Sequence, residues 1–170
     1  IATRLVQKTG ELVDLNTKEA EKHLRAIMHG NYPRITFAEA LKMINADSDR
    51  QTDLSFEEDL MLSQKFDCPF WIYNYPKSVR DAVYHENTEG KYDTYDLMLP
   101  FGYGEISTGG IRPKTGEAIL TQSVNNLGES QETLTHGHAE WKRTHQIQTA
   151  GFGIGLERLL RFISGSRTVL

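Results

Sequence analysis

The sequence predicts an α+β fold in which helices flank an antiparallel sheet. Three helix-start signatures fall within the first 65 residues, whereas aromatic and glycine-alternating segments typical of strands dominate after residue 68. Two of these strand segments are separated only by a short turn and can form a hairpin. Helices that precede such strands, rather than alternating with them, favour an antiparallel sheet covered by helices.

Each helix predicted in the first 65 residues begins with a short polar residue that has glutamate three positions later. Such a pair forms a capping box, in which each side chain accepts a hydrogen bond from the other residue's backbone amide. In chain order the pairs are Asn16 and Glu19, Thr36 and Glu39, and Ser55 and Glu58, with helices expected over 17–29, 37–44 and 56–65. Gly30 then ends the first helix.

The strands and the remaining helices follow from aromatic content, alternation and flanking turn residues. In chain order we expect strands at 69–76, 92–99 and 103–108, one or two helices within 113–145, a strand at 151–155, and a helix at 156–163.

Composition excludes several classes of protein. The chain has 170 residues, with 23 acidic and 19 basic side chains and a formal net charge of −4, so it lacks the basic excess of an independent nucleic-acid binder. No apolar run is long enough to cross a membrane. The single Cys68 excludes an intramolecular disulfide framework and a cysteine zinc cage, and it favours a cytoplasmic location.

Three glycines alternate along the last predicted strand, at 151, 153 and 155. Because a strand has period two, all three lie on one face, where a flat ligand or another backbone can approach closely. Phe152 and Ile154 lie on the other face and are expected to enter the core. Close packing of another element against the glycines is the alternative interpretation.

The helix after these glycines carries a predicted core stripe of four apolar residues, Leu156, Leu159, Leu160 and Ile163. Arg158 lies off that stripe in the first turn, where the helix dipole disfavours a cation. A guanidinium placed there is suited to a phosphate or to stacking on a base. An ion pair with Glu157 is the alternative.

A second group of polar residues lies at 96–112. Asp96 interrupts an apolar strand, and Glu105, Ser107 and Thr108 offer further oxygen ligands of the kind that Mg²⁺ takes. Arg112 follows Glu105 by seven residues, so a bulge at Gly109-Gly110 is expected to bring both side chains to one face. The alternative is a hairpin whose edge charges are solvated.

Other polar residues are less specific. His136 and His138 have metal-ligand spacing but no third ligand in the sequence, so no metal site is predicted there. Residues 74–77 and Tyr84 line a pocket near the sheet or, alternatively, belong to an aromatic strand packed in the core.

These segments together resemble the class II aminoacyl-tRNA synthetases of the aspartate and asparagine subgroup, over about residues 34–165. Gly151-Phe-Gly-Ile-Gly155-Leu-Glu-Arg158 resembles their motif 3, and Gly104-Glu105-Ile-Ser-Thr-Gly-Gly-Ile-Arg112 resembles the segment that precedes it. Tyr75-Pro76-Lys77, followed by Tyr84, is similar to the same subgroup.

The resemblance implies a role for each residue of the site. Arg158 and Glu105 would be catalytic. Residues that would bind ATP are Glu105, Gly155, Leu156, Glu157 and Arg158; those that would bind the amino acid are Arg112, Gly109, Gly110 and Tyr84; and those that would hold Mg²⁺ are Glu105 and Thr108, assisted by Asp96. The implied reaction is attack of an amino-acid carboxylate on the α-phosphorus of ATP.

The sequence departs from the family pattern in two respects. Motif 1, motif 2 and the anticodon-binding domain are absent, so residues 1–170 are expected to be the C-terminal part of a catalytic domain, with motif 3 at 151–163, and to be inactive alone. Thr149 stands where these enzymes usually carry histidine. This departure is more similar to archaeal proteins related to asparaginyl-tRNA synthetase, some of which make free asparagine.

Three hypotheses follow. The first is ATP- and Mg²⁺-dependent activation of asparagine or aspartate by an asparaginyl-tRNA-synthetase-like ligase of protein biosynthesis, dimeric and able to use tRNA when complete. The second is synthesis of free asparagine from aspartate and ammonia through aspartyl adenylate. The third, from another class, is a binding module that has lost catalysis.

Overall fold

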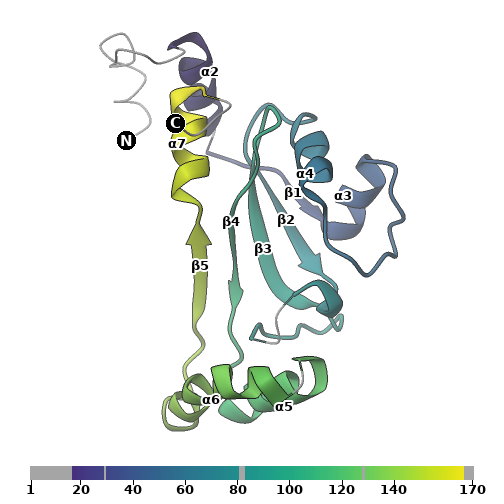
Figure 1. Cartoon of the computed structure of the whole chain (residues 1–170), viewed down its shortest axis with the longest axis vertical. Coiled ribbons are helices and arrows are strands. Elements are labelled where there is room, and N and C mark those ends of the chain that lie inside the picture. The colour runs from purple at the N-terminus through teal and green to yellow at the C-terminus, as the bar shows by residue number, and fades with distance from the viewer. Residues whose placement is uncertain (1–16, 29, 81–82, 128, 167–170) are drawn as a thin grey trace.

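The computed structural model describes residues 17–28, 30–80, 83–127 and 129–166. Its centre is a five-stranded sheet in the order β1-β2-β3-β4-β5, with helices at both ends and on one flank (Figure 1). No helix in these ranges is long and apolar enough to cross a membrane.

The strands are β1 (Arg34–Thr36), β2 (Phe70–Tyr75), β3 (Tyr92–Leu99), β4 (Gly104–Ile111) and β5 (Ala150–Ile154). Strands β2 to β5 pair antiparallel with their neighbours, as predicted, whereas β1 pairs parallel with β2. The α+β class is therefore confirmed, with a sheet that is mixed at one edge. The sequence prediction omitted β1, because three residues show no periodicity.

The helices are α2 (Thr17–Met28), α3 (Phe37–Met43), α4 (Phe56–Ser63), a short 3₁₀ turn (Lys77–Val79), α5 (Gly116–Leu127), α6 (Glu129–Thr144) and α7 (Leu156–Ser164). The capping boxes at Thr36 and Ser55 are confirmed, with Glu39 and Glu58 completing them. Asn16 and His29, at the ends predicted for the first helix, lie outside the described residues. One or two helices were predicted within 113–145, and the structure has two, α5 and α6.

Two hydrophobic clusters hold the helices to the sheet. Helices α3 and α4 pack on β2 through a cluster that includes Phe37, Leu41, Leu62, Phe70 and Ile72. Helices α2 and α7 lie side by side (Figure 1) and share the second cluster, which includes Leu99, Tyr103, Ile106 and Phe162. Helices α5 and α6 pack on each other at the far end of β4 and β5.

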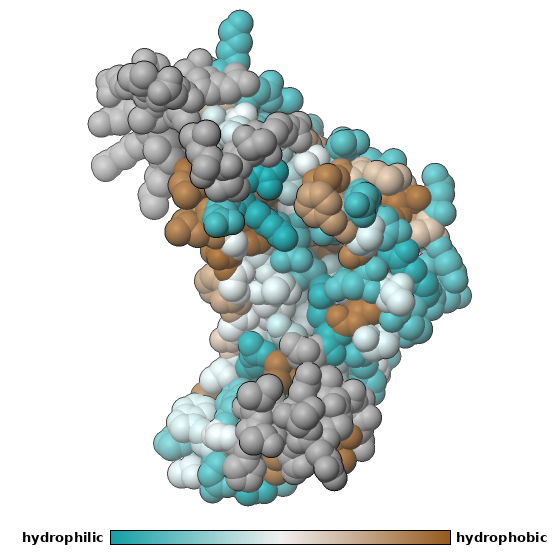
Figure 2. Space-filling view, in the orientation of Figure 1, coloured by the Kyte–Doolittle hydropathy of each residue, from teal (hydrophilic) through white to brown (hydrophobic). Residues whose placement is uncertain are grey.

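The prediction that Phe152 and Ile154 enter the core is wrong, because they are 70% and 52% exposed. Only half of the apolar stripe predicted for α7 lies against the core. Leu159 and Ile163 pack against the cluster that includes Phe162, whereas Leu156 and Leu160 are exposed. Among the described residues β5 is an edge strand that pairs only with β4, and its Phe152 side chain is largely exposed. Figure 2 shows the hydrophobic surface that results along the β5–α7 edge.

Candidate functional site

A β-bulge in β4 brings Glu105 and Thr108 to the same face of the sheet. Asp96 of β3 lies opposite Thr108, and Met98 lies opposite Glu105, so β4 carries one more residue than β3 over this stretch. The extra residue reverses the alternation, as bulges do. The predicted bulge therefore exists, but not at Gly109-Gly110, which pair regularly with β3.

The bare face of β5 continues this polar face of β4. Gly153 lies opposite Thr108 and Gly151 opposite Gly110, so the glycines adjoin the predicted ligand residues without adding side chains. A Cβ at Gly153 would meet nothing within 4 Å. We call this surface, with Asp96, Glu105, Thr108 and Arg112, the polar face.

The two glycines of β4 face opposite ways. A Cβ at Gly110 would lie 2.5 Å from the Tyr84 ring, so only glycine leaves room for that tyrosine on the polar face. A Cβ at Gly109 would lie 2.7 Å from the Cβ of Phe152, on the opposite face of the sheet. Gly109 can therefore contribute to the predicted substrate site only through its backbone.

Arg158 and Glu105 lie together although 53 residues separate them. The Arg158 Nη1 donates to the main-chain oxygen of Glu105 over 2.6 Å and lies 3.8 Å from its Oε1. Gly155 caps α7 without a side chain, and the aliphatic part of Arg158 lies over it. The guanidinium thus meets Glu105 rather than Glu157, and it remains half-exposed for a ligand.

Asp96 is buried and already bonded to other side chains. Its Oδ2 accepts from the Tyr75 hydroxyl over 2.6 Å and from the Arg80 guanidinium. Burial raises the pKa of Asp96, whereas the Arg80 charge opposes that shift. The other carboxylate oxygen, Oδ1, is buried without a hydrogen-bond partner among the described residues, and Thr108 lies opposite Asp96 on β4.

Sequence reasoning missed Arg80, whose guanidinium pairs with the Asp96 carboxylate of the polar face. Its guanidinium lies 3.8 Å from the Tyr75 ring centroid and pairs with Asp53 over 2.8 Å as well as with Asp96. The arginine follows a short turn after the aromatic strand and belongs to no recognisable local motif. Only the sheet brings it to Asp96.

Asp59 is the second missed residue. It lies in the first turn of α4, where the sequence explains an acid by the helix dipole alone. A Cβ at Gly104, the neighbour of Glu105, would lie 3.5 Å from the Cβ of Asp59. Burial, followed by the charge of Glu105, raises the pKa of Asp59 to about 7.

Burial also raises the pKa of Glu105, as does the charge of Asp96, and Arg158 opposes the shift. This end of the polar face therefore has an excess of carboxylates and favours a cation. The described residues contain no group of three or more His, Cys, Asp or Glu arranged for a metal, and the side chain of His136 is not among them. One carboxylate with a neighbouring hydroxyl does suit Mg²⁺, which takes its other ligands from water and phosphates.

Arg112 lies at the other end of the polar face. Its guanidinium lies 4.6 Å from the ring centroid of Tyr84 and beside Gly151 of the neighbouring strand. The backbone N–H of Arg112 donates to the Thr149 oxygen over 2.8 Å and so extends the β4–β5 pairing by one residue. The structure therefore brings Tyr84 and Arg112 together, as predicted.

A model of the tRNA synthetases class II (D, K and N) matches residues 2–170, nearly the whole chain. The chain belongs to this family. The fold class expected from the resemblance is thus confirmed.

Curated relatives include the asparagine--tRNA ligase of Thermococcus gammatolerans, which is 26% identical over 96% of this chain and 39% of its own length. The asparagine--tRNA ligase of Mycoplasma mobile is 30% identical over 94% of this chain and 37% of its own length. The chain therefore spans about two fifths of the length of the synthetases that it matches.

Among solved structures, the asparaginyl-tRNA synthetase from Pyrococcus horikoshii matches 96% of this chain and 40% of its own, with a TM-score of 0.79 and 27% identity. The same synthetase complexed with asparaginyl-adenylate matches with a TM-score of 0.77 and 27% identity, over 94% of this chain and 38% of its own.

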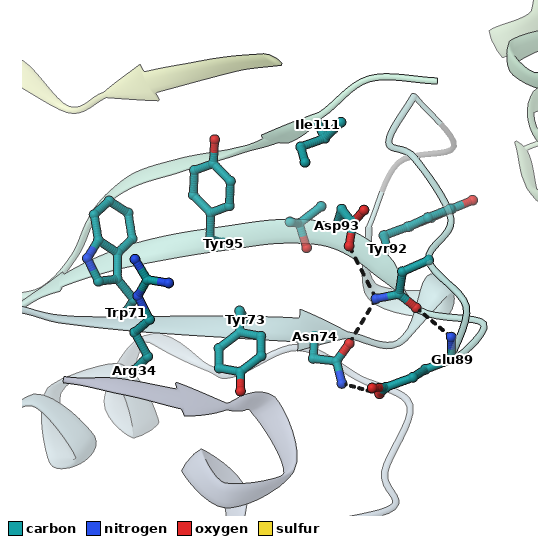
Figure 3. A pocket seen from close by; sticks show the side chains of 11 residues that line it. Arg34, Trp71, Tyr73, Asn74, Glu89, Tyr92, Asp93, Tyr95 and Ile111 are labelled. Atoms are coloured by element: carbon teal, nitrogen blue, oxygen red, sulfur yellow. Dashed lines mark hydrogen bonds between the residues drawn. The ribbon is translucent and has the colours of Figure 1, made fainter. Parts of the chain in front are cut away.

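The chain also has a hollow of about 720 Å³, which belongs mainly to the opposite face of the sheet. Figure 3 shows its aromatic floor, with Trp71, Tyr73 and Tyr95, and hydrogen bonds that link the polar side chains at one end. Asn74 lines it, as predicted, but Tyr84 and the other predicted site residues do not. The hollow is thus separate from the polar face.

Proposed function

We propose that the complete protein containing this chain activates aspartate or asparagine as an aminoacyl adenylate, with ATP and Mg²⁺. The observation that carries the proposal is the order of side chains on the polar face. Arg158 and Glu105 lie at one end, Thr108 lies beside the bare glycines in the middle, and Arg112 lies at the other end. This arrangement suits a long ligand that has separate anionic groups.

The Arg158 end is the proposed nucleotide site. The half-exposed guanidinium can stack on adenine and contact a phosphate, because Glu105 holds one of its N–H groups in place. Gly155, Leu156 and Glu157 would line the nucleotide with the first turn of α7, where backbone N–H groups favour an anion.

Glu105 and Thr108 would hold Mg²⁺, which when bound neutralises charge on the ATP phosphates. Asp96, which lies opposite Thr108 on the neighbouring strand, would assist this pair. In this scheme the chain supplies position and charge rather than a covalent nucleophile.

Arg112, with Tyr84 and Gly110, is the proposed site of the amino acid. The Arg112 fork would bind the polar end of the substrate side chain, and the Tyr84 ring would keep that fork in place. The substrate carboxylate would then attack the α-phosphorus of ATP, a new O–P bond would form, and pyrophosphate would leave. Binding and alignment on one rigid sheet are the chain's contribution to that step.

We further propose that residues 1–170 form the C-terminal part of the catalytic domain. The matches to about two fifths of each relative support its being part of a longer protein, and the resemblance of residues 151–158 to motif 3 supports the C-terminal position. Because the relatives are asparagine--tRNA ligases, tRNA is the first acceptor to test, and ammonia is the second.

The test is ATP–pyrophosphate exchange by the complete protein with Mg²⁺, comparing aspartate with asparagine and using no tRNA. We expect exchange with one of them, and we expect Arg158→Ala to abolish it. Arg25→Ala, which removes an exposed guanidinium from α2, is the matched control and is expected to keep full exchange. Exchange with neither amino acid would contradict the proposal and favour a non-catalytic binding module.

A further inference from the structure

Lys142 of α6 is completely buried, although it ends a polar helix at the surface of the molecule. Its Nζ donates to the Thr149 hydroxyl over 2.9 Å and to the main-chain oxygen of Ile147. A buried ammonium is costly unless something specific compensates it. The position of Thr149, which accepts a hydrogen bond from this ammonium, indicates which group would compensate the charge.

Thr149 lies on the polar face, beside Arg112. Gly110 pairs with Gly151 and Ile111 with Ala150, so Arg112 and Thr149 form the next cross-strand pair, which their backbone hydrogen bond confirms. Side chains of such a pair have Cβ atoms about 4.5–5.5 Å apart on the same face. The Lys142 ammonium therefore lies behind the polar face at its Arg112 end.

This end of the polar face has positive charge without counter-ions in the described part of the chain. Glu117 and Glu140, the two acids of the helix pair whose side chains are described, bind Arg143, and neither Arg112 nor Lys142 forms an ion pair with a described carboxylate. Burial lowers the pKa of His138, and the charges of Lys142 and Arg112 lower it further. The acidic residues of the face gather instead around Glu105, at the opposite end.

The hydrogen bond from Lys142 also orients the Thr149 hydroxyl. Because Oγ1 accepts from the ammonium, its own O–H is available to donate to a ligand on the polar face. A carboxylate there would accept from Thr149 and Arg112 and would compensate both cations. A carboxamide would leave their charge uncompensated, and buried sites of this kind discriminate strongly between such groups.

We propose that Lys142 is a specificity-determining residue, which acts through Thr149 and with Arg112 selects an aspartate side chain over an asparagine side chain. This inference rests on the proposed adenylate-forming function and deepens it. Lys142 is a positioning residue, since the ammonium itself is shielded from the ligand by Thr149.

The test is exchange by the complete protein over a range of aspartate and asparagine concentrations, with wild type, Lys142→Met and Lys142→Arg. We expect the wild type to prefer aspartate. Lys142→Met should raise the KM for aspartate about 10- to 100-fold with a smaller change in kcat, and should leave the KM for ATP unchanged. Lys142→Arg should keep part of the preference for aspartate that Lys142→Met loses, because arginine keeps the positive charge.

Two further variants separate specificity from folding. Thr149→Val keeps the shape of the side chain but removes the hydroxyl, so it should reproduce the loss of aspartate preference. Lys42→Met removes an exposed lysine from α3 and should leave both KM values unchanged. Protection of each variant by aspartate and by asparagine in thermal unfolding gives a readout that does not depend on turnover.

The outcomes distinguish this inference from the proposed function. Exchange with asparagine alone would overturn the inference and keep the function, whereas exchange with neither would overturn both. Equal losses with both amino acids in Lys142→Met, without rescue by arginine, would show that Lys142 only holds α6 in place.

Discussion

The Arg158 guanidinium donates a hydrogen bond to the main-chain oxygen of Glu105 over 2.6 Å. This contact joins the first turn of α7 to the bulged part of β4, and both elements also share the cluster around Phe162. A cation that would be unfavourable in the first turn of an isolated helix is thus compensated by a carbonyl and a nearby carboxylate. The contact leaves the Arg158 side chain about half exposed.

Arg158→Lys is expected to lose most ATP affinity although it keeps the positive charge. Lysine has neither the planar face that stacks on a base nor two forked donors that can hold Glu105 and a phosphate together. We expect a loss of about 10- to 100-fold in ATP affinity, measured by calorimetry on the complete protein. The melting temperature should change little, because the side chain is half-exposed. Unchanged ATP affinity would contradict the assignment of the nucleotide site.

The buried pair of Arg80 and Asp96 gives a second prediction. Arg80→Met keeps the volume of the side chain but leaves the Asp96 carboxylate buried without its cation, so unfolding free energy should fall by about 3–5 kcal/mol. Asp96→Asn together with Arg80→Met should lose less than Arg80→Met alone, because no uncompensated charge remains. Urea unfolding of the wild type and the two variants measures both effects.

The matched control for this pair is the exposed ion pair of Arg25 and Glu21 in α2. Removing it should change the unfolding free energy by less than about 0.5 kcal/mol, as is usual for surface pairs. A loss from Arg80→Met as small as that of the control would contradict the structural role assigned to the buried pair.

Glu58 provides a prediction about pH. Two hydrogen bonds from Arg50, together with bonds from Ser55, lower the pKa of Glu58 to about 2. Because the folded-state pKa lies below the unfolded one, near 4.5, the folded state is stabilised at pH values above 4.5. That stabilisation should be lost as the pH falls from about 4.5 to 2.

Glu58→Gln should therefore destabilise the protein at pH 7 by about 1–2 kcal/mol, a value reduced for the partial exposure of the pair. The difference from wild type should shrink as the pH falls below 4, since wild-type Glu58 is then progressively protonated. Thermal unfolding at pH 7, 4 and 3 measures this difference in stability. Glu57→Gln, a substitution at an exposed neighbouring residue, is the control. A difference that is constant with pH would show that the carboxylate charge does not matter.

Local signals explain why much of this fold was predictable from the sequence. Capping boxes at Thr36 and Ser55 depend on residues three apart, and the alternation of β5 is visible within five residues. The grouping of Glu105 with Thr108, Arg112 and Arg158 came from the spacing of family motifs. None of these signals requires knowledge of distant contacts.

The features that the sequence did not predict all depend on distant parts of the chain. Arg80 reaches Asp96 only because β2 and β3 pair, and Asp59 lies near Glu105 only because α4 packs on β4. The predicted position of the bulge, at Gly109-Gly110, was wrong because glycines permit a bulge but do not require one. The register between β3 and β4 determines where the extra residue lies. Phe152 was expected inside because alternation shows which residues share a face, not which face is covered.

Two glycines of the polar face should respond oppositely to alanine. In Gly153→Ala the added Cβ meets nothing within 4 Å, so the folding stability should hold while the bare ligand face is filled. In Gly110→Ala the Cβ would lie 2.5 Å from the Tyr84 ring and 2.6 Å from the Asp93 oxygen, so overpacking should cost about 1–3 kcal/mol of stability. Thermal unfolding and ATP binding of both variants separate the two effects. If Gly153→Ala binds ATP as tightly as wild type, no flat ligand approaches this part of β5, and its glycines serve a different purpose.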